Sequence, residues 1–230
     1  MNLEVPLISD STFAKWTLAW AEQQERDKPF SFFRRDQALQ VAVMLDHASA
    51  SLLLSTLGAS TVKIRFGLRR DEHGHEHFEL LLFGVDAYGQ RLTPYYNPNQ
   101  AEYAAGANTA PPQGNLPAEL ARQWMQHWAE KGQADELDAA VFTTPYGFLQ
   151  GYNYPVHEFM EALQPFADAP NVRIAFGLHR YLGLPTAPDD AQGRVVYTFG
   201  LLFNAVAAGQ RVTDFEESYF DLTAPCPRTC

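Results

Sequence analysis

The chain has 230 residues with 46% hydrophobic content, which is enough for a globular core, and its 17 basic and 27 acidic residues give a formal net charge of −10. That charge argues against general nucleic-acid binding, which neutralises phosphates with Lys and Arg, and against binding to anionic membranes. Because no apolar run approaches the roughly 20 residues that span a bilayer and the first residues lack the basic and apolar regions of a secretory signal, we expect a cytoplasmic protein.

The first half begins with an expected helix over Ser9–Arg26. Ser9 can accept a hydrogen bond from the free N–H groups of the first turn. Trp16 and Trp20 lie one turn apart, on a single helical stripe. We interpret this stripe as the face that packs on a sheet, rather than as a surface that stacks a ligand.

Five further elements are expected in the first half. The alternation of Phe30–Phe32 predicts a short strand. Asp36 is expected to cap a second helix that runs through Leu45, with a continuation past His47 to Leu57 as the alternative. Val62–Leu68 alternates apolar and polar residues, as a strand does. Phe78–Val85 is apolar on both faces, which is typical of a strand covered on both sides. A further strand is expected over Arg91–Tyr95.

A change in composition separates the two halves. Tyr96–Pro117 is rich in Pro, Gly, Asn and Ala and is interpreted as a linker, with the domain boundary in residues 106–115. A helix is then expected from Asn115, with a stripe that contains Trp124 and Trp128.

The rest of the second half follows the plan of the first. Thr144–Pro155 is rich in Gly, Pro and Tyr and is expected to be partly irregular, and a helix follows Pro155. Strands are expected at Val172–Leu178 and at Val195–Val206.

The order of elements reflects an internal repeat. Val62–Leu68 reads V-K-I-R-F-G-L and Val172–Leu178 reads V-R-I-A-F-G-L, at an offset of 110 (172 − 62). Further matches are Trp16 with Trp124, Trp20 with Trp128, Leu39 with Leu149, His47 with His157, and Leu82 with Leu202. We therefore predict an α+β or α/β fold formed by tandem duplication, with domains 1–105 and 116–230 packed as an intramolecular pseudo-dimer.

Each half resembles a group of small, uncharacterised bacterial proteins of about one copy length. The resemblance is carried by Lys63–Leu68, a strand of the type I-R-I-x-F-G-L, by Leu81–Gly89, which reads L-L-F-G-V-D-A-Y-G, and by Phe220–Cys230, which ends P-C-P-R-T-C. Those proteins also carry a Trp-containing N-terminal helix. The Cys-containing tail follows the second half alone, because the first half continues into the linker. The resemblance implies the repeat-domain organisation and no activity.

The densest cluster of potential metal ligands is Glu72–His77, which reads E-H-G-H-E-H. His73, His75 and His77 beside carboxylates would suit a divalent metal such as Zn²⁺, Ni²⁺ or Cu²⁺. The matching loop, Tyr181–Gly193, contains no His. We therefore interpret the cluster as a solvated hairpin loop, with metal binding as the alternative, and expect no other cofactor.

His47 and His157 are the paired imidazoles of the two halves in this alignment. Each could bond the backbone, or the two could meet across a pseudo-twofold axis. A role as general base would need a nucleophile or a substrate site beside it.

A basic strip follows the first repeated strand and includes Lys63, Arg65, Arg69 and Arg70. Such a strip could receive an anion or an acidic partner, or its members could pair with neighbouring Asp and Glu. Arg65 and Arg69 are the candidates for ligand or interface contacts.

Tyr146, Tyr152 and Tyr154 lie in the aromatic segment of the second half. They could line a pocket or an interface, or pack between the two halves.

Cys226 and Cys230 are the two cysteines of the chain. They could remain reduced, form a local or intermolecular disulfide, or help to bind a metal.

No sequence signature of catalysis stands out. The chain contains no G-x-x-x-x-G-K-[ST], G-x-G-x-x-G, G-x-S-x-G or H-E-x-x-H motif. We therefore expect a non-enzymatic protein-binding or assembly module that acts through a protein partner or self-association. The alternative is a small-ligand or metal-binding protein, with its site between the repeats or at the His-rich loop.

Overall fold

The computed structural model describes residues 7–26, 28–98, 100–104, 118–163, 171–182, 195–206 and 224–226. The elements of the first half are β1 (Leu7–Ile8), α1 (Asp10–Ala21), η1 (Glu22–Glu25), η2 (Ser31–Phe33), β2 (Arg34–Arg35), β3 (Ala38–Asp46), α2 (His47–Leu54), β4 (Thr61–Arg70), β5 (Glu76–Val85), β6 (Tyr95–Tyr96) and β7 (Gln100–Ala104). Those of the second half are α3 (Ala118–Gln133), η3 (Ala139–Phe142), β8 (Thr143–Thr144), β9 (Gly147–Phe148), β10 (Gly151–Pro155), α4 (Val156–Leu163), β11 (Asn171–Leu182), β12 (Val195–Val206) and β13 (Ala224–Cys226).

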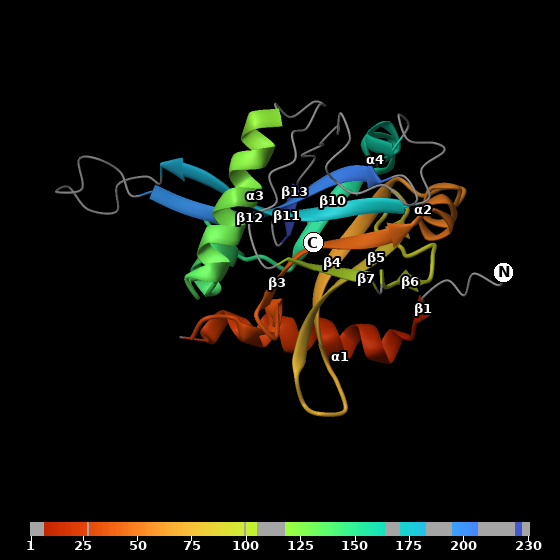
Figure 1. Ribbon diagram of the computed structural model, residues 1–230. Helices are drawn as coiled ribbons and strands as arrows, with labels where there is room; N and C mark the ends of the chain where they lie inside the picture. The colour runs from red at the N-terminus through yellow and green to blue at the C-terminus, as the bar shows by residue number, and fades with distance from the viewer. Residues whose placement is uncertain are drawn as a thin grey trace.

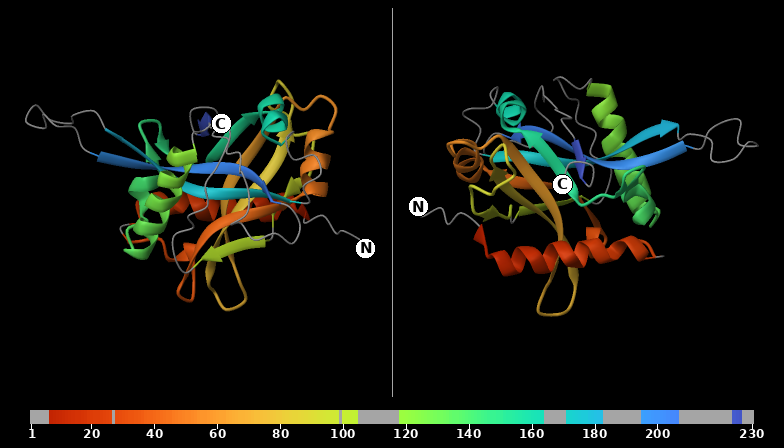
Figure 2. Two further views of the ribbon diagram at one scale, coloured as in Figure 1. Left: turned by 45° about the horizontal axis from the view of Figure 1, so that its top comes forward. Right: turned by 180° about the vertical axis from the view of Figure 1, so that it is seen from behind.

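The strands form two main sheets and a small β8–β9 hairpin. Sheet A has the strand order β1-β6-β5-β4-β10-β13, and sheet B has the order β12-β11-β3-β2, with β7 also paired to β3. Every strand pair among the described residues is antiparallel, so the fold is α+β (Figure 1). Helix α1 packs against β4 and α3 packs against β11, as the views of Figure 2 show. No helix in the described part of the chain is both long and apolar enough to cross a membrane.

Each half contributes a strand to the sheet of the other half. β10 of the second half pairs with β4, with Tyr152 opposite Ile64. β3 of the first half pairs with β11, with Val43 opposite Ile174. The donated strand runs in both cases directly into a short helix, α2 or α4. Neither main sheet is therefore built from one half alone.

The inner faces of the two sheets enclose one hydrophobic core drawn from both halves. Trp20 is fully buried near its centre. The rings of Phe66, Phe78, Phe142 and Phe148 surround the indole at centroid distances between 5.0 and 5.5 Å. Because the last two rings belong to the second half, α1 is anchored by both halves.

The indole N–H groups of two tryptophans link the halves reciprocally. Trp20 Nε1 donates to the carbonyl oxygen of Leu149 at 2.7 Å, and Trp128 Nε1 donates to that of Gln40 at 2.9 Å. A buried N–H needs an acceptor, since leaving it unpaired costs free energy. The stripe of each Trp helix therefore stabilises the strand region that the other half provides.

The glycine in each F-G-L segment lets a helix approach its sheet. A Cβ placed on Gly67 would lie 3.1 Å from Trp16 Cβ, and one placed on Gly177 would lie 3.0 Å from Trp124 Cβ. Both distances are shorter than an ordinary van der Waals contact of a Cβ atom. Each glycine thus lies against the Trp that precedes Trp20 or Trp128 by one helical turn.

Several expected elements are confirmed. Ser9 caps α1 and its side chain accepts from Thr12 N. The repeated segments lie inside β4 and β11, and β12 has the expected bounds, Val195–Val206. Helix α4 begins directly after Pro155.

The expected helix from Asp36 to Leu45 is wrong, because this segment is β3. β3 lies between β11 and β7, and both of its faces are covered, so its apolar run does not alternate. A short apolar run of this kind fits a buried strand as well as a helix. Asp36 has φ 55° and turns the chain between β2 and β3 instead of capping a helix.

Three other segments differ from expectation. Phe30–Phe32 is not a strand, since a 3-10 helix begins at Ser31. Thr144–Pro155 is more regular than expected, because it contains part of the β8–β9 hairpin and all of β10. The expected linker, Tyr96–Pro117, contains β7, which joins sheet B. Residues 106–115 and Cys230 lie outside the described residues.

Strand pairing shifts the residue-by-residue correspondence between the two halves by one position in the second strand of each hairpin, β5 and β12. When β4 is matched to β11 through the F-G-L segments, Leu82 is the partner of Ile64 and Phe203 is the partner of Ile174. Leu82 therefore corresponds to Phe203 instead of Leu202. A one-residue slip moves a side chain to the other face of a strand, so residue identity alone misassigns the inner face here.

Candidate functional site

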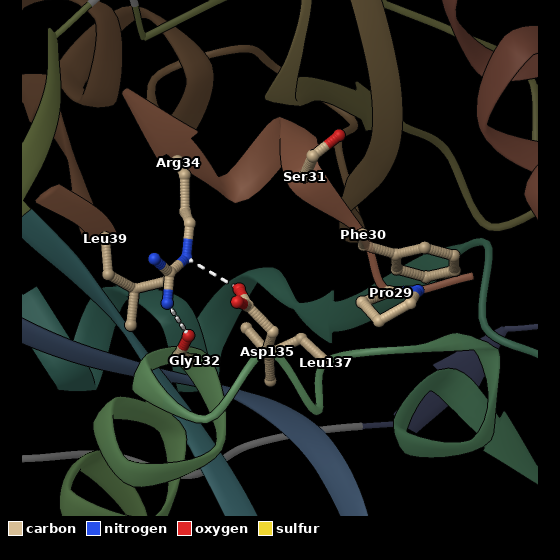
Figure 3. Close-up of a pocket in the computed structure, with 8 residues that line it drawn as sticks. All are labelled: Pro29, Phe30, Ser31, Arg34, Leu39, Gly132, Asp135 and Leu137. Atoms are coloured by element: carbon tan, nitrogen blue, oxygen red, sulfur yellow. Dashed lines mark hydrogen bonds and ion pairs between the residues drawn. The ribbon is translucent and has the colours of Figure 1, made fainter. Parts of the chain in front are cut away.

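Two adjoining cavities share Ser31 and Arg34 and form one groove, called here the Arg34 groove. The first cavity, of about 290 Å³, is shown in Figure 3 and is lined by Pro29, Phe30, Ser31, Arg34, Leu39, Gly132, Asp135 and Leu137. The second, of about 560 Å³, is lined by Ser31, Arg34, Arg35, Asp36, Asp71, His73, Gly74, His75, Glu76 and His77. The groove therefore joins the η2–β2 segment to the end of α3 and to the β4–β5 loop.

The end of α3 forms one wall of the groove. The N–H of Asp135 bonds the carbonyl of Gly132 and that of Glu136 bonds the carbonyl of Lys131, which is the Schellman pattern. Asp135 takes the left-handed position of this motif, with φ 55°. A Cβ on Gly132 would lie 2.4 Å from Leu39 Cδ2, so glycine lets α3 approach β3 without displacing the Leu39 side chain.

Arg34 spans the groove between the halves. Its Nε lies 3.3 Å from Asp135 Oδ1, and Nη2 donates to the carbonyl oxygen of Gly132 (Figure 3). The guanidinium thus neutralises the exposed Asp135 carboxylate and satisfies a carbonyl of the last turn of α3. This contact fixes the position of β2 relative to the second half.

The His-rich loop is organised around the Asp71 carboxylate. Asp71 Oδ1 accepts from the N–H groups of His73 and His75, both at 2.9 Å. Asp71 Oδ2 lies 3.0 Å from His77 Nε2 and 3.5 Å from His75 Nδ1. The bond with His77, followed by the two backbone N–H groups, holds the pKa of Asp71 well below its ordinary value despite some desolvation.

Arg35 differs from the other arginines around the groove. Arg26 and Arg70 both pair with Glu76, at 3.5 and 2.8 Å, and Arg34 pairs with Asp135. The exposed Arg35 makes no ion pair or hydrogen bond with any described residue. The groove therefore offers one uncommitted guanidinium beside the imidazoles of the loop.

Arg35 also lies near a phenol whose acidity is altered. Burial, and then the nearby Glu79 carboxylate, raise the pKa of Tyr103, while Arg35 and Arg69 act in the opposite direction. Glu79 is itself bound by Arg69 Nε at 2.7 Å and by Asn97 Nδ2 at 3.1 Å. A polar cluster therefore extends from Arg35 towards β5 and β7.

In the described part of the chain, no group of three or more His, Cys, Asp or Glu side chains is arranged to hold a metal ion. His73 and His75 are largely exposed, with side-chain exposures of 71% and 75%. His77 is 18% exposed and is engaged with Asp71. The carboxylate of Asp71 thus engages His77 and His75 directly.

His47 and His157 are exposed and lie outside the groove lining. Strand pairing makes Asp46 the partner of Asn171 and Pro155 the partner of Thr61. Since Thr61 matches Asn171 in the repeat, His47 corresponds to Val156 instead of His157. The two imidazoles are therefore displaced by one position, and neither hydrogen-bonds another described residue.

The aromatic candidates are divided between core and surface. Tyr152 and Tyr154 are buried, at 3% and 0% exposure, and the hydroxyl of Tyr152 donates to the carbonyl oxygen of Phe199. Tyr154 packs edge-on against Phe203. Tyr146 lies in the β8–β9 turn and is 52% exposed. The buried pair packs between strands of the two sheets.

The other candidates lie on sheet A. Arg69 pairs with Glu79 and Arg65 is nearly buried, at 9% exposure. The backbone of Cys226 lies in β13, in register with Gly151.

Arg34, Arg35 and Asp135 were not among the residues that the sequence singled out. An R-R-D segment after two phenylalanines carries no motif, and Asp at a helix end is common. Their meeting depends on the approach of α3 to β3, which pairing between distant segments decides. The left-handed backbone of Asp135 is the one local feature that marks this site, and it can be recognised only in the structure.

In comparisons with known proteins, no family model, no curated protein and no solved structure matches the chain.

Proposed function

We propose that the chain is a non-enzymatic binding module, a fused pseudo-dimer of two repeats, which recognises an acidic segment of a protein partner through the Arg34 groove. The observation that carries the proposal is the uncommitted Arg35 guanidinium at a groove whose other arginines are paired. Arginine binds carboxylates through a planar fork of N–H donors, which favours an acidic partner.

The reciprocal strand exchange supports the pseudo-dimer part of the proposal. β3 and β10 occupy matching places beside β11 and β4, and the indoles of Trp20 and Trp128 bond across the halves in both directions. A shared core makes the groove a rigid cleft between halves instead of a hinge. A rigid site loses little conformational freedom when it binds.

The exposed imidazoles support an acidic partner in a second way. His73 and His75 line the same cavity as Arg35 and lie largely in solvent. Both can donate to carboxylates, and protonation would add positive charge beside Arg35. Two of the acids that line this cavity are already engaged, since Asp71 binds the loop and Glu76 binds two arginines.

The second candidate function is the binding of a small anionic ligand. The cavity beside the His-rich loop, of about 560 Å³, has the size of a small-molecule site. An open groove lined by several charged residues fits an extended acidic peptide better, because small-ligand pockets are mostly apolar with few polar groups. The same arginine would serve either ligand.

Site-specific photo-crosslinking tests the proposal. A photo-reactive residue replaces Ser31, which lines both cavities, and a matched one replaces the exposed Ser11 of α1. We expect a defined protein adduct from position 31 and none from position 11 in cells of the source organism. Arg35→Glu should abolish the adduct, because it reverses the charge that the acidic segment meets.

Lys15→Glu is the matched control, since it makes the same charge change on the exposed surface of α1. The adduct should persist in this variant. Equal adducts from both positions, or an adduct that survives Arg35→Glu, would contradict the protein-binding proposal. Extra mass of a small molecule in native mass spectrometry, lost in Arg35→Glu, would favour the second candidate.

A further inference from the structure

A second pair of cations lies away from the groove, on the outer face of sheet A. Lys63 and Arg65 alternate with the core residues Val62, Ile64 and Phe66 along β4, so they share the opposite face. Arg65 is nearly buried, at 9% exposure, whereas Lys63 is partly exposed.

The Arg65 guanidinium is held by neutral oxygens. Its Nη1 donates to the carbonyl oxygens of Ile64 and Tyr152, at 3.1 and 3.3 Å, and to Asn153 Oδ1 at 3.0 Å. Its carbon lies 5.9 Å from the ring centre of Phe83. All three hydrogen bonds use one nitrogen. The Nε and Nη2 hydrogens therefore have no acceptor among the described residues.

The charge of this pair is not compensated within the described part of the chain. No described carboxylate forms an ion pair with either Lys63 or Arg65. Burial lowers the pKa of Arg65 to about 10, and burial together with Arg65 lowers the pKa of Lys63. A buried cation without an anion carries a desolvation cost that an ion pair would offset.

Sheet B shows what compensation looks like at the matching place. Arg173, which corresponds to Lys63, is 1% exposed and binds Glu102 through Nε at 2.7 Å and Nη2 at 3.2 Å. Glu102 lies on β7, in register with Ala42 and through it with Ala175. The carboxylate thus comes from β7, the strand that pairs with β3.

The matching positions of sheet A lack that carboxylate. Strand pairing puts Cys226 in register with Gly151, and Gly151 in register with Arg65. Cys226 therefore holds the place of Glu102, and Arg65 holds the place of Ala175. Sheet A thus carries the guanidinium of Arg65 where sheet B has Ala175, and it carries Cys226 where sheet B has the acidic residue Glu102.

We infer that Lys63 and Arg65, with Asn153 beside them, form a binding site for an oxyanion, either a phosphate or a carboxylate group of a ligand. The Nε and Nη2 donors of Arg65 match the two oxygens of such a group. Lys63 supplies a second charge at the solvent side, where the anion enters. The site shares no residue with the Arg34 groove and stands independently of the function proposed for it.

Isothermal titration calorimetry with sodium phosphate and, separately, sodium acetate tests the inference, at constant ionic strength set with sodium chloride. We expect saturable binding of at least one of the two anions by the full chain. Phosphate alone would identify a phosphate site, acetate alone a carboxylate site, and both a general oxyanion site.

Two variants assign the binding to this face. Lys63→Gln should weaken it by about tenfold, the loss of one charge-assisted hydrogen bond. Arg65→Lys keeps the charge but loses the fork, and should weaken binding similarly. Lys15→Gln, on α1, should leave it unchanged. No binding of either anion, or equal binding by the wild type and Lys63→Gln, would overturn the inference.

Discussion

Sheets A and B share one scaffold but differ in how they treat buried charge. Each combines a two-stranded hairpin from one half with a strand donated by the other, and each receives a helix through a glycine contact. On sheet B, Arg173 is compensated by Glu102. On sheet A, Arg65 meets neutral oxygens and a ring, and no described carboxylate pairs with Arg65 or Lys63.

The difference separates what holds the fold from what is free to act. Apolar inner faces and the indole bonds of Trp20 and Trp128 recur in both sheets, because both are needed to close the shared core. The outer polar positions do not affect closure, so one can serve stability and the other a ligand. A buried cation left uncompensated is the kind of local cost that points to function.

The largest expected effect concerns Gly151 and its counterpart Ala42. Gly151 has φ 146°, and a Cβ there would lie 2.0 Å from the carbonyl oxygen of Ile64. Gly151→Ala should therefore lower the free energy of unfolding by at least about 3 kcal/mol. Ala42→Gly should cost about 1 kcal/mol. Urea denaturation measures both, and equal costs would remove this asymmetry between the sheets.

The next effect tests the compensated charge. Glu102→Gln leaves the buried Arg173 without its anion and should cost about 3 kcal/mol in urea denaturation. Lys63→Gln, at the matching place of sheet A, should be neutral or stabilising. The exposed pair of Glu119 with Arg122 is the control, since Glu119→Gln should cost less than about 1 kcal/mol. A cost for Lys63→Gln as large as that for Glu102→Gln would contradict the distinction.

A third prediction concerns the feature that the halves share. Trp20→Phe and Trp128→Phe each remove an indole donor and leave a carbonyl of the other half unpaired. Each should lower the free energy of unfolding by about 2 kcal/mol. Thermal and urea unfolding would measure the pair side by side. Widely different costs would show that the two cross-half bonds are not equivalent.

The smallest effect compares two turns built alike. Asp71 Oδ1 accepts from His73 N and His75 N, as Asp86 Oδ1 accepts from the N–H groups two and four residues later. Each loop also contains a glycine with φ near 80°, at positions 74 and 89. Asp71→Asn and Asp86→Asn should both loosen their loops, as measured by amide hydrogen exchange, with little change in global stability.

The contribution of Asp71 to the stability of its loop depends on pH. Because its pKa is held below the ordinary 3.8, its contribution to loop stability is complete above that value and is lost as the pH falls through the lowered pKa. A ¹³C NMR titration of the carboxyl group should show this. His77→Gln removes the leading cause and should move the pKa back towards 3.8. An unchanged titration in that variant would contradict the assignment.

Much of the local structure could be predicted from sequence. The cap at Ser9, the two F-G-L strands and β12 follow from hydrogen-bonding groups and periodicity within a few residues. β3 was mistaken for a helix, since a short apolar run without alternation fits either a buried strand or a buried helix. β7 was hidden in a segment with the composition of a linker, because a strand of five residues carries little periodicity.

The site was accessible to sequence reasoning in part. The three histidines line the Arg34 groove as a cluster, but Arg34, Arg35 and Asp135 join them only because α3 meets β3. The expected basic strip divides in the structure. Arg69 and Arg70 pair with acids of the neighbouring strand, while Lys63 and Arg65 do not.

The sequence by itself determined where most strands and helices lie and which residues can fill a core, because hydrophobic spacing and capping act over one or two turns. Which half supplies the partner of β4 or β11, and whether Leu202 or Phe203 faces the core, was decided by the tertiary structure. Antiparallel pairing is set by backbone groups common to all residues, so it leaves little trace in residue type. The same pairing determines that Arg173 meets the carboxylate of Glu102, whereas Arg65 meets none among the described residues.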